Sequence, residues 1–142
     1  MNIERGIIRR CEQSFLRANL SHYNLKPEDS VVLHILQKKG GCNQEALCSI
    51  MDMDKGRMAR IMERMEDRLF IHRIINSADK REKLIELTEA GREMLLIIDS
   101  LFEQWDEQCF IDFTAEERMQ YQDYLERIAK NALARKENLE HD

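Results

Sequence analysis

The sequence predicts a mainly α-helical fold that contains one small β-hairpin. Charged residues make up 35% of the 142 residues and hydrophobic residues 43%, a composition typical of amphipathic helices. One proline and five glycines are too few to separate the many short strands of an all-β fold. Apolar residues recur every three or four positions along most of the chain, and only residues 71–88 hold short β-branched segments instead. The length fits a single-domain chain, residues 1–142.

The first two helices are predicted from an apolar stripe and from a proline. Residues 3–20 place their apolar side chains on one helix face: Ile3, Ile7, Ile8, Cys11, Phe15 and Ala18. Pro27 suits the first turn of a second helix, where its missing N–H needs no partner. Glu28 and Asp29 follow and complement the positive end of the helix dipole. The helix is expected to stop at the glycine pair that begins with Gly40.

Two capping residues predict the next two helices, and a hairpin follows them. Asn43 is a good N-cap for residues 44–51, and Asp54 for residues 55–69. The tight turn between these helices is typical of a helix-turn-helix, with the second helix in the recognition position. The two strands of the hairpin and its polar tip are expected at residues 71–76, 83–88 and 77–82.

Two further helices complete the chain. One is expected over residues 89–110, and a capping box of Thr114 with Glu117 opens the other, which should reach residue 134. The outer helices carry apolar faces with no internal partner of matching length, which favours packing between two copies of the chain. The sequence thus predicts a compact core and flanking dimerisation helices, at residues 27–88, 1–22 and 89–137.

The fourth helix carries an arginine ridge. At about 100° per residue, one narrow stripe of this helix holds Arg57, Arg60, Arg64 and Arg68. Arginine suits phosphate and guanine contacts because its planar fork donates two parallel hydrogen bonds. The alternative is a solvated surface on which these arginines pair with Glu63 and Glu66 of the same helix.

The charge distribution separates the centre of the chain from the rest. The chain has a net charge of −5, but residues 55–83 hold nine basic and five acidic residues, a net charge of +4, which leaves −9 for the remainder. An acidic protein with a basic centre can bind a polyanion locally, while its acidic remainder weakens non-specific binding.

Four short segments in the centre of the chain form one recognisable pattern. Residues 54–65 (DKGRMARIMERM) are followed by residues 70–73 (FIHR), then by Asp79-Lys80-Arg81 at the hairpin tip and by residues 87–91 (LTEAG). With this pattern the chain resembles the multiple antibiotic resistance regulator (MarR) family of winged-helix transcription factors, in which the tip residues are the wing signature. The resemblance implies a winged helix-turn-helix core with long N- and C-terminal dimerisation helices. The chain departs from the family at Leu69, where a glycine is usual.

The resemblance also implies which residues meet DNA. Arg81 resembles the wing arginine that enters the minor groove, and Asp79 resembles the acid that orients wing arginines, with Arg73 as its expected partner. Lys26 stands where the family usually has a hydroxyl cap. Together with the arginine ridge, this predicts the DNA-binding residues Lys55, Gly56, Arg57, Arg60, Arg64, Arg73, Asp79, Lys80 and Arg81.

The function implied is a sequence-specific transcriptional regulator, a homodimeric repressor that binds a pseudo-palindromic double-stranded operator. Family members are released by small, often aromatic, ligands, and the candidate effector-binding residues here are His22, Tyr23 and His34. The apolar faces of the outer helices predict the dimer contacts Ile7, Cys11, Phe15, Leu125, Ile128 and Ala132.

Two alternatives differ from this interpretation. The first is an oxidant-sensing regulator that uses Cys11 or Cys109. Some family members sense oxidants through a cysteine in the first helix, where Cys11 lies, although its place on the apolar stripe favours a buried thiol. The second alternative is a helical protein-interaction module that does not read DNA. No enzyme, metal or cofactor is expected, because no catalytic or metal-ligand spacing is found. No signal peptide or membrane span is expected either, which predicts a cytoplasmic protein with reduced thiols.

Overall fold

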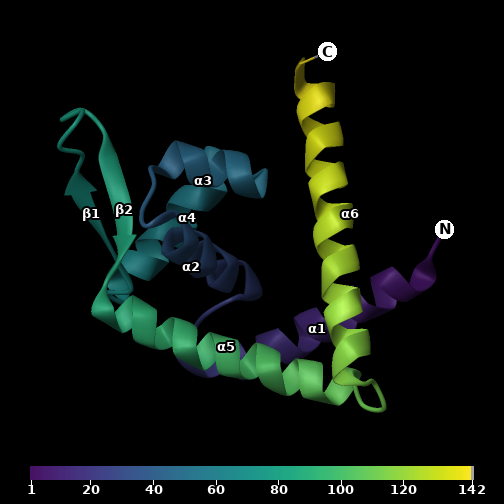
Figure 1. Ribbon diagram of the computed structural model, residues 1–142. Coiled ribbons are helices and arrows are strands. Elements are labelled where there is room, and N and C mark those ends of the chain that lie inside the picture. Colours follow the sequence, from purple (N-terminus) through teal and green to yellow (C-terminus); the bar gives the residue numbers. More distant parts are fainter. Residues whose placement is uncertain (142) are drawn as a thin grey trace. The chain divides into compact units, whose positions relative to one another are not determined.

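The computed structural model describes residues 1–141 (Figure 1). It confirms the mainly α-helical fold with one antiparallel hairpin. The chain divides into two compact units, residues 1–105 and residues 106 onward, and each is described by itself. The elements in order are α1 (Ile3–Leu20), the 3-10 helix η1 (Ser21–Tyr23), α2 (Pro27–Lys39), α3 (Gln44–Met51), α4 (Lys55–Asp67), β1 (Ile71–Ile75), β2 (Lys83–Leu87), α5 (Glu89–Cys109) and α6 (Ala115–His141).

The first unit has one hydrophobic core, which α2, α3, α4 and the hairpin share with the C-terminal end of α1 and with α5. The apolar face predicted for this helix is buried at Met58, Ile61, Met62 and Met65, whereas Leu69, which was expected on the same face, lies beyond the end of α4 and is exposed. The caps are also as expected, because Asn43 accepts a hydrogen bond from the N–H of Ala46 at 2.7 Å and Asp54 one from Arg57 at 2.8 Å. The fully buried side chains include Leu16, Leu33, Leu36, Leu47, Met58, Ile61, Met62, Met65, Ile85 and Ile98.

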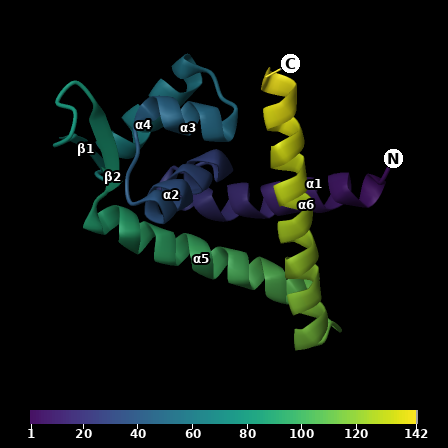
Figure 2. The ribbon, with the colours of Figure 1, turned by 45° about the horizontal axis from the view of Figure 1, so that its top comes forward.

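The hairpin is joined to the helix-turn-helix by a third short segment. Strands β1 and β2 pair with Arg73 opposite Ile85. Ile85 also forms an isolated bridge with Cys42, through N–H···O bonds of 2.7 and 3.1 Å. This bridge lies directly before α3 and was not predicted from the sequence. In Figures 1 and 2 the hairpin tip lies on the same side of the first unit as α3, opposite α5.

Helix α4 ends two residues earlier than predicted, in a left-handed turn without glycine. Leu69 has φ +63°, and its side chain is 71% exposed. The N–H of Leu69 donates to the carbonyl of Glu66, and the N–H of Phe70 to that of Met65. A leucine thus closes the helix as a glycine would, at a conformational cost of about 1–2 kcal/mol.

Helix α5 begins where two backbones approach closely. A Cβ added at Gly91 would lie 2.1 Å from the carbonyl oxygen of Phe70. The hydroxyl of Thr88 accepts a hydrogen bond from the N–H of Gly91 at 3.0 Å and donates one to the carbonyl of Leu69. Glycine is therefore required at position 91 because only glycine leaves room for the chain that connects α4 to the hairpin.

The N-terminal part of α1 does not bury its apolar stripe within the protomer. Leu16 and Leu20 are buried, whereas Ile7 is 47% exposed and Cys11 is exposed too. The interpretation of Cys11 as a thiol buried within its own chain is therefore wrong. The stripe continues beyond the core because α1 is longer than the surface that it covers.

The second unit consists of the end of α5, a short connection and α6. Thr114 and Glu117 form the predicted capping box, with hydrogen bonds of 2.8 and 3.1 Å. Phe110 packs edge-on against Phe113 and Tyr121, with ring centroids 5.3–5.4 Å apart. Helix α6 extends seven residues beyond the predicted end at residue 134, and large apolar side chains along it, such as Ile128, are exposed. Across residues 1–141, no helix is long and apolar enough to cross a membrane.

Candidate nucleic-acid interface

The first turns of α4 expose the residues that were predicted to meet DNA. Lys55, Gly56, Arg57 and Arg60 are all exposed. Gly56 leaves open space beside the backbone, because a Cβ there would meet only the Asp54 carboxylate, at 3.4 Å. This end of α4 therefore presents three cations and a backbone position without a side chain.

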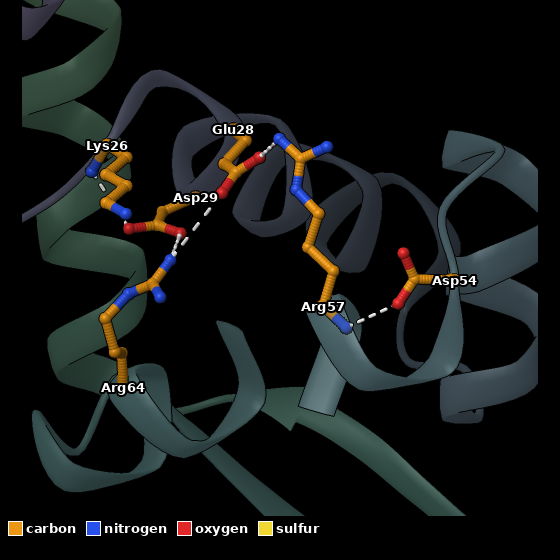
Figure 3. A network of polar contacts seen from close by, with 6 residues as sticks. All are labelled: Lys26, Glu28, Asp29, Asp54, Arg57 and Arg64. Carbon is orange, nitrogen blue, oxygen red and sulfur yellow. Dashed lines mark hydrogen bonds and ion pairs between the residues drawn. The ribbon is translucent and has the colours of Figure 1, made fainter. Parts of the chain in front are cut away.

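Arg57 is exposed and forms an ion pair with an acid of α2. Its guanidinium donates a hydrogen bond to the carboxylate of Glu28, in the first turn of α2 (Figure 3). The side chain of Arg57 is 56% exposed and that of Glu28 20%. The ion pair thus lies at the surface, where the solvent screens it strongly.

Arg64 has a different environment from Arg57, although both lie on the predicted ridge. It donates to the carboxylate of Asp29 at 2.8 Å, and Asp29 is fully buried (Figure 3). The second oxygen of Asp29 accepts the backbone N–H of Lys26 at 2.9 Å, and Arg64 also lies 3.8 Å from Glu28. Arg64 neutralises a buried carboxylate and thereby joins α4 to the start of α2.

The alternative pairing within α4 is not the arrangement observed for these arginines. Arg57 and Arg64 pair with the acids of α2, and Arg68 donates to the backbone carbonyl of Tyr23 at 2.9 Å. Glu66 binds Arg73 of β1 at 2.7 Å instead. From the sequence, Glu28 and Asp29 were interpreted only as acids that complement the positive end of the α2 helix dipole. Glu28 lies 29 positions before Arg57 and Asp29 lies 35 positions before Arg64, so the local sequence gave no signal of either pair.

The wing tip exposes Asp79, Lys80 and Arg81 together. Asp79 accepts a hydrogen bond from the backbone N–H of Arg81 at 3.0 Å, and its carbonyl accepts one from Glu82 at 3.0 Å. The expected pairing of Asp79 with Arg73 is wrong, because Arg73 is bound to Glu66. Asp79 therefore shapes the turn that carries Arg81, through the backbone of Arg81 rather than through a guanidinium.

The candidate effector residues lie in two places. His22 and Tyr23 are exposed in η1. His34 is partly buried, and its ring nitrogens lie 2.9 Å from the carbonyl of Ser30 and 2.7 Å from the carboxylate of Asp99. The structure does not bring His34 together with the other two. Near Tyr23, an open hollow of 470 Å³ is lined by Arg64, Asp67, Arg68 and Phe70, none of which was singled out for an effector.

The four cysteines differ in exposure. Cys11 and Cys109 are exposed, whereas Cys42 and Cys48 are half-buried, and all four are thiols. Burial raises the pKa of the Cys42 thiol, although Lys39 lowers it in part. Cys42 is therefore a weak nucleophile at neutral pH. Among residues 1–141, no group of three His, Cys, Asp or Glu side chains is placed to hold a metal ion.

The geometry defines a class: a winged helix-turn-helix protein whose recognition helix and wing both carry exposed cations. Residues 25–83 match the model of the MarR family. A solved structure titled as MarR superposes with a TM-score of 0.83 and 30% identity, covering 92% of this chain and 88% of that one. A second, titled as the transcriptional regulator SlyA, gives a TM-score of 0.76 and 26% identity over 91% of each chain.

Sequence relatives agree with these structures. The transcriptional regulator HosA of Escherichia coli O127:H6 is 31% identical over 66% of this chain and 68% of its own length. The regulator BilQ of Clostridium symbiosum is 32% identical over 66% of this chain, and the match spans 65% of that protein. The chain belongs to the MarR family of DNA-binding transcriptional regulators.

Proposed function

We propose that this chain is a cytoplasmic, homodimeric repressor that binds a pseudo-palindromic operator and leaves it when a small aromatic ligand binds. The observation that carries the DNA-binding part is the exposure of two sets of cations on one compact unit, at the start of α4 and at the wing tip. A helix N-terminus in the major groove and a basic turn in the minor groove use these two sets as a winged helix does. The proposed DNA contacts on α4 are Lys55, Gly56, Arg57 and Arg60, and those on the wing are Lys80 and Arg81.

The environment of the remaining predicted DNA residues supports an indirect role for them. Arg64 and Arg73 are bound to Asp29 and Glu66, so they hold α4 and β1 in place rather than reaching outward. Asp79 orients the wing backbone at Arg81. The proposed interface therefore contains fewer direct contacts than the arginine ridge suggests.

The exposed apolar side chains of the outer helices support the dimer. Leu125 and Ile128 of α6 are 40% and 59% exposed, and the stripe of α1 with Ile7 and Cys11 is exposed as well. Phe15 is half-buried against Trp105, with ring centroids 5.3 Å apart. Isolated helices with such faces are seldom stable in water, because their apolar surface needs a partner. We therefore assign the predicted dimer contacts Ile7, Cys11, Phe15, Leu125, Ile128 and Ala132 to a second copy of the chain.

The hollow beside α4 supports an anionic aromatic effector. Arg68 supplies positive charge there beside the carboxylate of Asp67, and Phe70 supplies an aromatic surface, whereas the charge of Arg64 is already paired with Asp29. The buried Nε of Arg64 has no hydrogen-bond partner within residues 1–141. Because Arg68 also holds the carbonyl of Tyr23, a carboxylate bound there would change the contacts of both α4 and the segment after α1.

The exposure of two thiols in the protomer, Cys11 and Cys109, favours one second candidate, a repressor that is released by oxidants. The dimer proposed above covers Cys11, so oxidation of this thiol competes with the dimer contact, whereas Cys42 is shielded within its own chain. If peroxide releases DNA from the wild type but not from Cys11→Ser, this candidate replaces the ligand-released repressor. If changing all four cysteines to serine leaves operator affinity and peroxide response unaltered, the oxidant mechanism is excluded.

The test of DNA binding starts from a random-sequence duplex library. Selection with the full chain should yield one operator with two related half-sites about one helical turn apart. Binding to it, followed by fluorescence anisotropy, should weaken steeply with salt, because several phosphate contacts release counterions. A chain that enriches no sequence, or that binds without dependence on salt, would instead be a protein-interaction module.

Light scattering tests the proposed dimer. It should give a dimer at micromolar concentration, and Leu125→Glu with Ile128→Glu should disrupt it.

A further inference from the structure

One cluster of polar side chains joins the wing to the helix-turn-helix and has no place in the function described above. The carboxylate of Glu82, at the base of the wing tip, accepts two side-chain hydrogen bonds. One comes from the amide of Asn43, directly before α3, and the other from the amide of Asn76, at the end of β1, at 2.7 Å. Each oxygen of Glu82 is thus used once, and all three residues are half-buried.

The orientation of both amides is determined by other contacts. The side-chain oxygen of Asn43 accepts the N–H of Ala46 at 2.7 Å as the N-cap of α3. The side-chain oxygen of Asn76 accepts the N–H of Ala78 at 2.9 Å. Neither amide can turn over without losing such a bond, so each presents its NH₂ group to Glu82. The side chain at position 82 must therefore accept one hydrogen bond from the amide of Asn43 and another from the amide of Asn76.

The same cluster holds the backbone of the tip. The N–H of Asn76 donates to the carbonyl of Glu82 at 2.9 Å, and the N–H of Glu82 donates to the carbonyl of Asp79 at 3.0 Å. Arg81, the proposed minor-groove residue, lies between these points, with its own N–H bound to Asp79. The position of Arg81 relative to α3 thus depends on Glu82.

For DNA binding alone, an acid at position 82 is unfavourable. Its carboxylate lowers the positive field of the two neighbouring cations of the wing tip and repels phosphate. Two charge-assisted hydrogen bonds offset this repulsion by holding the turn in one position. Such a contribution raises affinity by reducing the entropy lost on binding.

We propose that Asn43, Asn76 and Glu82 form a clamp that sets the wing tip relative to α3, and that Glu82 is thereby a positioning residue for the minor-groove contact of Arg81. The inference rests on the proposed function, because it presupposes that Arg81 meets DNA. The clamp differs from the contact between Asp79 and the N–H of Arg81, because that contact lies within the wing alone.

Two single substitutions break the clamp with opposite changes in charge. Glu82→Gln removes a negative charge and turns an NH₂ group toward an amide donor. Asn43→Asp adds a negative charge and places two carboxylates together, while it keeps an N-cap for α3. The double variant, Asn43→Asp with Glu82→Gln, restores the wild-type charge and the hydrogen bond, now donated by the glutamine to the aspartate.

The assay measures anisotropy on the selected operator at fixed salt, with flanks that are either A·T-rich or G·C-rich. In both single variants, the ratio of operator affinity with A·T-rich flanks to that with G·C-rich flanks should fall by about threefold, which is the effect of one net hydrogen bond. The double variant should regain the wild-type ratio. Hydrogen exchange without DNA should show faster exchange at the N–H of Arg81 and Glu82 in the single variants only. Glu86→Gln is the matched control, since Glu86 lies on β2 and pairs with His72 at 3.6 Å, and it should keep the preference.

The outcomes separate the clamp from the function on which it rests. If Arg81→Ala keeps the flank preference of the wild type, the wing does not read DNA and the inference fails with that function. If Arg81→Ala loses the preference while both single variants keep it, DNA reading stands and the clamp is refuted. If Glu82→Gln binds more tightly and Asn43→Asp more weakly on both flanks, charge alone explains the residues and the clamp is again refuted.

Discussion

Two arginines of α4 that lie one turn apart, Arg60 and Arg64, have different environments. Arg60 is exposed in the second turn, whereas Arg64, one turn later, is bound to the buried carboxylate of Asp29. The first turn of α2 supplies counter-charges to two arginines, Glu28 to Arg57 and Asp29 to Arg64, and of these two acids only Asp29 is fully buried. Under the proposed function, the arginines on one stripe are divided between contacting DNA and holding the fold, and the neighbouring helix α2 decides which of them hold the fold.

The largest effect should come from removing the structural arginine. Arg64→Ala leaves Asp29 buried without its cation, which should lower the free energy of unfolding by about 3 kcal/mol. Urea denaturation measures this loss. The double variant with Asp29→Asn should recover part of the stability. An Arg64→Ala chain as stable as the wild type but unable to bind operator would show that Arg64 belongs to the interface after all.

The exposed arginine should show the opposite profile. Arg60→Ala should weaken operator binding by about 1–3 kcal/mol, if Arg60 reads a base, and leave the unfolding midpoint unchanged. The matched control is Arg60→Lys, which keeps the charge but loses the bidentate fork. Lysine should rescue a phosphate contact but not a guanine contact. A loss of stability in Arg60→Ala would remove the distinction between the two ends of the helix.

The turn that ends α4 offers a test that concerns stability alone. Leu69→Gly relieves a left-handed backbone at φ +63° and removes a side chain that is 71% exposed. Thermal unfolding should therefore show a gain of about 1 kcal/mol. Operator affinity should stay the same, since Leu69 lies at the end of α4 away from Arg57. A destabilised variant would mean that the leucine side chain contributes a contact that outweighs its strain.

The smallest effect should come from the surface pair between Glu28 and Arg57. Glu28→Gln releases the Arg57 guanidinium for phosphate, and operator binding should tighten by about 0.5 kcal/mol, the scale of an exposed ion pair. In the Arg57→Ala background the gain should largely disappear, which a double-mutant cycle by anisotropy measures. Weaker binding of Glu28→Gln would show that Glu28 orients Arg57 for DNA instead of competing with it.

Local sequence signals determined most of the architecture. The caps at Asn43, Asp54 and Thr114, the proline that opens α2 and the apolar spacing of α4 all act within a few residues, so each could be interpreted from its neighbours. The wing signature with its following Leu-Thr, together with residues 54–65, was specific enough to indicate the family.

Tertiary structure decided what the polar side chains do. The partner of Arg64 lies 35 positions away and the partner of Glu82 39 positions away, and no periodicity links such residues. Arg73 binds Glu66 rather than Asp79, and Cys42 bridges Ile85, because packing places α4, the hairpin and the start of α3 side by side. Helices form from local hydrogen bonds and an apolar face, whereas a charged side chain takes whichever counter-charge the packed fold brings near it.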